Sequence, residues 1–184
     1  MSSVKKACYC SICTALCYIL PLLFHALGIG AVFSPMHIPV LLCGLLCGWP
    51  YGLFCGAAGP VVSSLLSGMP AAMQLVYMVP ELAVYGLCAG LLYNRVHTRS
   101  AAADLYLALV PAMIAGRVAG GAARALFYLS TAQPYSVGLW ASAYFVETLP
   151  GAVLHLLLIP ALVLILAKAG LIPARTAGGR GGRV

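Results

Sequence analysis

Long apolar runs, broken only by short segments rich in Gly, Pro or Arg, occupy the chain from Tyr9 to Ala167. Hydrophobic residues make up 63% of the 184 residues and charged residues only 7%, which is too little polar surface to cover a water-soluble globule. A helix that crosses the hydrocarbon core of a bilayer needs ~20 apolar residues. These features predict an all-α membrane protein, folded as one compact bundle rather than as two domains.

The breaks divide the apolar sequence into six segments. The stretch from Met36 to Ser67 would be roughly 48 Å long as one helix, against a core of ~30 Å, so it must bend. Gly48-Trp49-Pro50-Tyr51-Gly52 is the natural point. The predicted membrane helices are Tyr9–Ile29, a short second helix Met36–Cys47, Tyr51–Ser67, Met73–Tyr93, Asp104–Ser130 and Leu139–Ala167. Residues 1–172 are expected to form the membrane domain, and residues 173–184 a flexible, basic cytosolic tail.

The basic residues predict the orientation. With six helices, all the flanking Lys and Arg fall on one side, whereas the opposite loops near residues 30–36, 68–72 and 131–138 carry none. The flanking residues are Lys5, Lys6, Arg95, Arg99, Lys168, Arg175, Arg180 and Arg183. By the positive-inside rule, both termini are therefore expected in the cytoplasm. The formal charge of +7 does not indicate a nucleic-acid partner, because these residues are too scattered to form a basic stripe.

The start of the chain allows two other interpretations. Lys5 and Lys6 before an apolar run can mark a signal peptide, but the run from Ala7 to Val32 exceeds the usual ~7–15 apolar residues, so an uncleaved first helix is expected. Four of the eight cysteines crowd this region: Cys8, Cys10, Cys13 and Cys17. No second CxxC or Cys/His pair follows Cys10 and Cys13, so we expect structural thiols and no metal site.

Charged residues inside apolar helices are candidates for function, because they are costly to bury in a membrane. Counting ~1.5 Å per residue places Glu81, Arg117 and Glu147 in one layer in the outer half of the bundle. Positions three, four and seven apart share a helical face with these charges. The resulting candidates for an outward-facing, aromatic-lined pocket are Gln74, Tyr77, Glu81, Tyr85, Arg117, Arg124, Trp140, Tyr144, Glu147 and, more weakly, His37 with Ser63, Ser64 and Ser67. Such a pocket suits a small amphipathic ligand.

Two other roles remain open for these residues. Arg117 can pair with Glu81 or Glu147 only to hold the bundle together, as in a noncatalytic membrane scaffold. His155 and Glu147, eight residues apart, can belong to an intramembrane enzyme, although no nucleophile or metal set accompanies them. The chain lacks a P-loop, a Gly-x-Ser-x-Gly elbow and a His-Glu-x-x-His pair, so neither an enzyme nor a bound cofactor is expected.

A strip of small residues follows the first helix. Ala7, Ser11 and Ala15 recur every four positions, which leaves a flat surface where another helix can approach closely. Internal packing and a partner subunit explain this strip equally well.

Several motifs resemble one family of membrane proteins. They are His37-Ile38-Pro39-Val40-Leu41-Leu42, Trp49-Pro50-Tyr51-Gly52, Gly59-Pro60, Ser63-Ser64-Leu65-Leu66-Ser67-Gly68-Met69-Pro70, Ala115-Gly116-Arg117 and Pro150-Gly151. Together they resemble the substrate-specific S components of energy-coupling factor (ECF) transporters, and the likeness covers all six predicted helices. These motifs are mostly structural, so they specify the family better than its ligand.

The resemblance implies a six-helix protein in the plasma membrane of a prokaryote that captures a small water-soluble vitamin from outside. The protein then topples in the bilayer to release the vitamin, driven by a transmembrane T subunit and two cytosolic ATPases. It also implies that the small-residue strip, at Ser11 and Ala15 or at Ala7 and Ser11, docks on the T subunit. A carboxylate ligand would suit Arg117 and Arg124, and pantothenate is one family substrate that fits.

Overall fold

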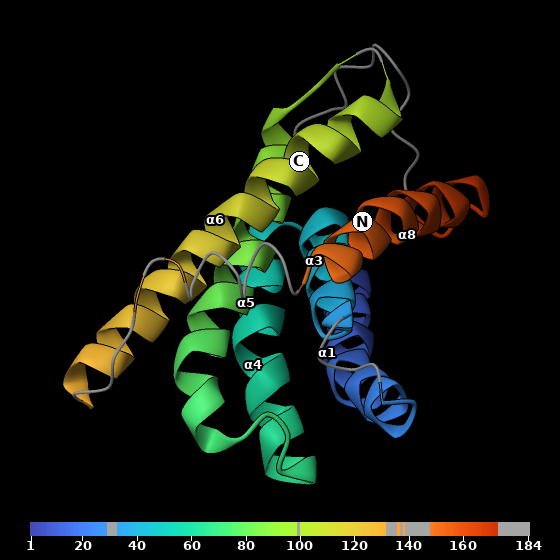
Figure 1. The fold of residues 1–184 in the computed structure, drawn as a ribbon. Helices are drawn as coiled ribbons and strands as arrows, with labels where there is room; N and C mark the ends of the chain where they lie inside the picture. The colour runs from blue at the N-terminus through green and yellow to red at the C-terminus, as the bar shows by residue number, and fades with distance from the viewer. Residues whose placement is uncertain (29–32, 99, 132–135, 137, 139–147, 173–184) are drawn as a thin grey trace.

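The computed structural model describes residues 1–28, 33–98, 100–131, 136, 138 and 148–172 (Figure 1). This part of the chain contains helices and turns but no strand, which confirms the all-helical prediction. Its helices are α1 (Ser3–Ala26), α3 (His37–Cys47), α4 (Trp49–Ser67), α5 (Ala72–Arg95), α6 (Ala101–Ser130) and α8 (Leu149–Lys168). Four of them, α1, α5, α6 and α8, are long and apolar enough to cross a membrane.

Several helix ends differ from the predicted ones because hydropathy marks the membrane core and not the last helical turn. The first helix starts at Ser3 rather than Tyr9, since the side chain of Ser2 caps it by accepting a hydrogen bond from the backbone N–H of Lys5. The last described helix starts at Leu149 with Pro150 in its first turn, where no N–H is needed, rather than in the helix interior. The predicted start of this helix at Leu139 lies outside the described residues.

The predicted bend between the second and third helices is confirmed. Gly48 ends α3 at φ +95°, a conformation that side chains other than glycine rarely adopt, and α4 begins at the next residue. The two helices fold back on one another closely, since a Cβ added at Gly52 would lie 2.6 Å from the Cα of Gly44. The short α3 and the longer α4 therefore form a hairpin inside the bundle.

Helix α3 lies at the centre of the fold, in contact with α1, α4, α5 and α8 (Figure 1). Nearly all of its residues are buried. Helix α5 packs between α4 and α6, and its Gly86 meets the backbone of the hairpin directly: a Cβ added there would lie 2.9 Å from the Cα of Gly52. Glycines thus allow three helices to meet without intervening side chains.

The periphery of the bundle is apolar, as a lipid environment requires. Large hydrophobic side chains are exposed on several helices, among them Ile12, Leu65, Ile114 and Leu157. On α1, by contrast, only one stripe is buried, which consists of Cys10, Cys13, Cys17 and Pro21. All eight cysteines are free thiols, and most of them pack in the core as small hydrophobic side chains.

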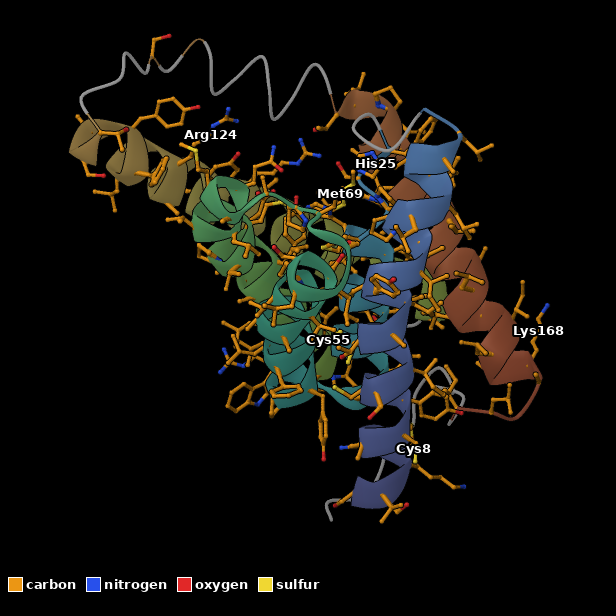
Figure 2. The ribbon with its side chains drawn as sticks, turned by 90° about the horizontal axis from the view of Figure 1, so that it is seen from below. Cys8, His25, Cys55, Met69, Arg124 and Lys168 are labelled. Atoms are coloured by element: carbon orange, nitrogen blue, oxygen red, sulfur yellow. The ribbon has the colours of Figure 1, made fainter. Side chains whose placement is uncertain are left out.

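The helix ends fall into two groups at opposite ends of the bundle. The hydroxyl of Tyr9 donates a 3.0 Å hydrogen bond to the carbonyl of Leu171, which places the start of α1 beside the end of α8. Gly48 lies near Asn94, so the hairpin bend and the end of α5 are also neighbours. Figure 2 shows Cys8 near one end of the molecule and His25, Met69 and Arg124 towards the other. Lys5, Lys6 and Arg95 belong to the end that carries Cys8.

Candidate functional site

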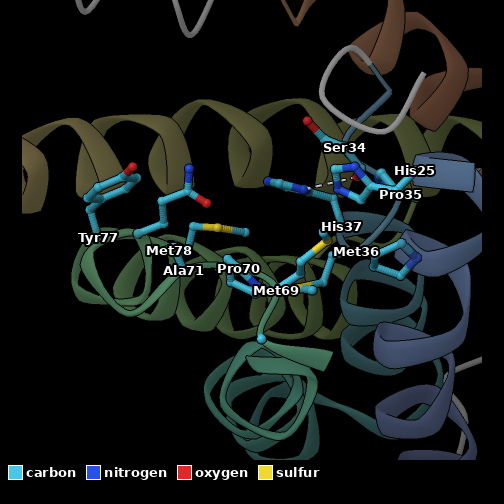
Figure 3. Close-up of a pocket in the computed structure, with 13 residues that line it drawn as sticks. His25, Ser34, Pro35, Met36, His37, Met69, Pro70, Ala71, Tyr77 and Met78 are labelled. Carbon is cyan, nitrogen blue, oxygen red and sulfur yellow. Dashed lines mark hydrogen bonds between the residues drawn. The ribbon is translucent and has the colours of Figure 1, made fainter. Parts of the chain in front are cut away.

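A cavity of about 560 Å³ lies at the end of the bundle opposite Cys8 (Figure 3). It is enclosed by the last turns of α1, the segment that leads into α3, the loop between α4 and α5, and the first turns of α5. The lining residues are Pro21, His25, Ser34, Pro35, Met36, His37, Gly68, Met69, Pro70, Ala71, Gln74, Tyr77 and Met78. Its volume falls within the ~300–1,000 Å³ of sites for small molecules.

The cavity wall combines apolar surface with a few polar groups. Figure 3 shows His25, His37 and Ser34 on one side, Tyr77 and Met78 on the other, and Met69 and Pro70 along the floor. The residues that line the cavity in the described part of the chain include no Lys, Arg, Asp or Glu. Methionine thioethers and a tyrosine ring make favourable contacts with flat aromatic groups, and the imidazoles and Gln74 can fix orientation.

Serines at the end of α4 hold the floor of the cavity in place. The hydroxyl of Ser63 donates to the carbonyl of Met69, and that of Ser64 donates to the carbonyl of Pro70, both at 2.7 Å. Ser63 is almost completely buried. These bonds provide hydrogen-bond donors to two carbonyls in the loop between α4 and α5, where the backbone has no regular helical hydrogen bonding. The sequence analysis treated these serines as weak pocket candidates, whereas in the structure they position the loop.

His37 is the most highly connected polar side chain of the cavity wall. Its Nδ1 lies 3.1 Å from the carbonyl oxygen of Ser34, and its Nε2 lies 3.5 Å from Oε1 of Glu81. Its ring meets the ring of Tyr85 edge to face, with centroids 4.9 Å apart, and stacks on the ring of His155 at 5.7 Å. Three helices, α3, α5 and α8, therefore meet at one imidazole.

Two glycines of α6 make room for the acidic and aromatic groups of this layer. A Cβ added at Gly116 would overlap the ring of Tyr85, and one added at Gly120 would lie 2.6 Å from Oε2 of Glu81. Glu81 and Tyr85 are both buried, at 7% and 1% exposure. The two glycines, four residues apart, thus form a notch that receives the polar face of α5.

Arg117 lies between these glycines and is itself buried, at 8% exposure. Its guanidinium donates a 2.7 Å hydrogen bond to the hydroxyl of Thr148, the residue just before α8, and its charge acts on the neighbouring Tyr85. Within the described residues, the ion pair of Glu81 is with His37, although the sequence analysis had considered Arg117 as its partner. Arg117 therefore joins α6 to the segment before α8.

Arg124 lies two turns further along α6 from Arg117. Its guanidinium carbon is 5.1 Å from the ring centroid of Tyr77 and 5.5 Å from that of Tyr128. Both distances fall within the range of a cation–π interaction. Because Tyr77 lines the cavity, Arg124 supports the cavity wall indirectly, through its contact with the Tyr77 ring.

The predicted site residues thus fall into three groups. His37, Gln74 and Tyr77 line the cavity; Glu81, Tyr85 and Arg117 are buried around His37, and Arg124 reaches the cavity through Tyr77. Trp140, Tyr144 and Glu147 lie outside the described residues.

Sequence reasoning missed several residues of the cavity. It did not anticipate His25 or the methionines, and it grouped His155 with Glu147, although His155 stacks directly on His37. A histidine in the last turn of α1 was the one available signal, because apolar methionines have no distinguishing pattern.

The small-residue strip of α1 faces away from the other helices. Ala7, Ser11 and Ala15 are all exposed, and the hydroxyl of Ser11 donates to the carbonyl of Ala7 within its own helix. Packing inside the described bundle therefore does not account for the strip.

These features define the class of the molecule: a helical membrane protein with a small-molecule cavity near one end of its bundle. A family model, described as the substrate-specific component of ECF transporters, matches residues 6–163. The match covers most of the chain, so the protein belongs to this family. Comparisons with curated proteins and with solved structures gave no significant match.

Proposed function

We propose that this protein captures a small water-soluble vitamin or a related metabolite from outside the cell, for ATP-driven uptake by an energising module. The family consists of substrate-specific membrane components of transporters, which supports a binding role and association with a transmembrane T subunit and ATPase subunits. Because these components transport rather than transform their ligands, we assign no catalytic role to the chain.

The observation that carries this proposal is the position of the cavity relative to the basic residues. The cavity lies at the end of the bundle opposite Lys5, Lys6 and Arg95. Lys and Arg near the ends of membrane helices favour the cytoplasmic side. The cavity then faces the exterior of a prokaryotic plasma membrane, where a transporter must meet its substrate.

The ligand-binding residues we propose are those predicted from the sequence. Gln74, Tyr77 and His37 would contact the ligand directly, with Glu81, Tyr85 and Arg117 beside them. Arg117 or Arg124 would attract an anionic group, and pantothenate, which has a carboxylate, hydroxyls and an amide, remains one candidate. We also propose Trp140, Tyr144 and Glu147 as ligand-binding residues, on the basis of the sequence alone.

The partner surface we propose is the strip of Ala7, Ser11 and Ala15. Its residues are exposed, and its small side chains would allow the backbone of a partner helix to approach closely. This surface would receive the T subunit.

Thermal stability of the purified protein against a panel of vitamins tests the proposed function. A ligand that binds the folded protein raises its stability by mass action, so a true substrate raises the melting temperature as its concentration increases. Mass spectrometry of molecules that co-purify with the protein would name the substrate directly. If the folded protein gained no stability from any member of the panel and carried no co-purified ligand, the proposed binding role would be refuted.

A structural scaffold is the second candidate, because the buried polar groups contact one another. Glu81 faces His37, and Arg117 bonds to Thr148, so both pairs can hold helices together without a ligand. Replacing Tyr77 and Trp140 by alanine separates the two functions. A scaffold would keep any uptake phenotype unchanged, whereas a binding subunit would lose it.

A further inference from the structure

The two ring nitrogens of His37 both face hydrogen-bond acceptors. Nδ1 lies 3.1 Å from the carbonyl oxygen of Ser34 (Figure 3), and Nε2 lies 3.5 Å from a carboxyl oxygen of Glu81. A carbonyl oxygen can only accept, so Nδ1 must carry a proton. A neutral imidazole would then present the lone pair of Nε2 to the carboxyl group.

Only one arrangement of protons avoids two lone pairs facing each other. The contact favours a proton between Nε2 of His37 and Oε1 of Glu81, carried either by the imidazole as imidazolium or by the carboxyl group as the acid. Both forms have the same net charge, which is zero for the pair. Glu81 is 7% exposed, so little water is available to stabilise an uncompensated carboxylate there.

Among the described residues, the groups around the pair add no negative charge. Tyr85 of α5 meets His37 edge to face, and the charge of Arg117 from α6 acts on Tyr85. From α1, His25 lines the same cavity. Of the described acidic residues, Asp104 bonds to Thr98 near the start of α6, at the far end of the bundle from the cavity.

His155 of α8 stacks on the other face of the His37 ring and is 2% exposed. Neither of its ring nitrogens makes a hydrogen bond of regular geometry within the described residues, although the carbonyls of Phe33 and Ser34 lie close to it. An imidazolium at this position would lie against His37 and near Arg117 without a carboxylate partner of its own. We therefore expect His155 to be neutral, so that the excess proton stays on the Glu81 side of His37.

We propose that Glu81 and His37 hold one proton between them, and that this proton sets the charge selectivity of the cavity. With the proton in place, the described part of the wall carries no net negative charge to attract a cation, so the site admits neutral or anionic ligands and discriminates against cations. The shared proton stands on the geometry alone, whereas the ligand selectivity rests on the proposed function.

The shared proton can be measured without any ligand. The chain has two glutamates, so 13C-labelling of the glutamate carboxyl carbon gives two signals, and Glu81→Gln identifies the one from Glu81. Labelling histidine with 15N reports the protonation of each ring by NMR in lipid nanodiscs. His97, which is exposed beyond the end of α5, serves as the internal reference for a histidine outside the cavity.

At neutral pH we expect one of two signatures: an imidazolium at His37 with an ionised Glu81, or a neutral His37 with a protonated Glu81. The opposite result, a neutral His37 beside an ionised Glu81, would overturn the inference. The signals come from the unmodified protein, so the outcome does not depend on whether any variant folds.

The selectivity is tested by thermal shift with probes that differ in charge. Nicotinate with nicotinamide and pantothenate with panthenol are matched anionic and neutral pairs, and thiamine and choline are cations. We expect stabilisation from neutral or anionic probes only. His37→Asn removes the imidazole that compensates Glu81, so it should weaken the binding of an anionic probe at least about tenfold.

The possible outcomes separate the two proposals. Stabilisation by thiamine or choline would overturn the selectivity while supporting a binding function. If no probe stabilised the folded protein, the selectivity would fail, the vitamin panel would decide the proposed function separately, and the NMR signature would still decide the shared proton.

Discussion

Gly120→Ala tests whether the notch in α6 positions the acidic group of the site. A Cβ at this position would lie 2.6 Å from Oε2 of Glu81 and 2.8 Å from both its Cβ and its Cδ. The carboxyl oxygen can rotate away, but the Cβ is fixed to the backbone of α5. Either the Glu81 side chain leaves His37, or α5 and α6 separate.

The expected cost follows from the kind of overlap. Forcing one methyl group into a well-packed interface costs about 1–3 kcal/mol. If the overlap destabilises the ligand-binding position of Glu81 beside His37 by this amount, the affinity for ligand decreases by roughly 5- to 150-fold, since 1.4 kcal/mol corresponds to a factor of ten. We therefore expect a lower melting temperature without ligand and a smaller ligand-induced shift.

Val118→Ala is the matched control, because Val118 lies on the same helix, two residues away, with 52% of its surface exposed. Thermal unfolding in nanodiscs and the His37 and Glu81 NMR signals are measured for both variants. Only Gly120→Ala should alter either measurement. If it kept normal stability and normal signals at both residues, the notch would have no positioning role.

Substitutions at three other positions test separate parts of the structure. Ser63→Ala removes the donor to the Met69 carbonyl, so unfolding should become easier by roughly 1–3 kcal/mol, and an unchanged melting temperature would contradict the proposed loop support. Tyr77→Phe should retain the contact with Arg124, whereas Tyr77→Ala should lose about 0.5–2 kcal/mol of stability; equal melting temperatures for the two variants would refute a role for the ring. Tyr9→Phe removes an exposed hydrogen bond to the segment after α8 and should cost less than about 1 kcal/mol, so a large drop in melting temperature would contradict this assignment.

The sequence predicted features that depend on local chain chemistry. Gly48 and Pro50 interrupt an apolar stretch that is too long for one span, and the hairpin bends there. Counting the rise per residue also placed Glu81 and Arg117 at a common level, and both are buried around Tyr85.

The sequence could not predict which side chains meet at that level. Whether Glu81 faces His37 or Arg117 depends on how α3 is rotated against α5, and this rotation is set by contacts between glycine backbones. The regular spacing of these glycines indicates that helices approach closely, but it does not indicate which side chains then meet. The stacking of His155 on His37 likewise joins segments more than a hundred residues apart, and nothing local to either histidine indicates it.

The direct backbone contact at Gly86 has a mechanical consequence. Because no side chains separate α5 from the hairpin of α3 and α4, rotamer changes cannot absorb sliding between these helices. His37 and Glu81 both belong to these tightly packed helices, so the distance between them stays fixed while the rest of the cavity adjusts. A molecule that enters the partly open cavity therefore meets an imidazole held at a fixed distance from the carboxyl group behind it.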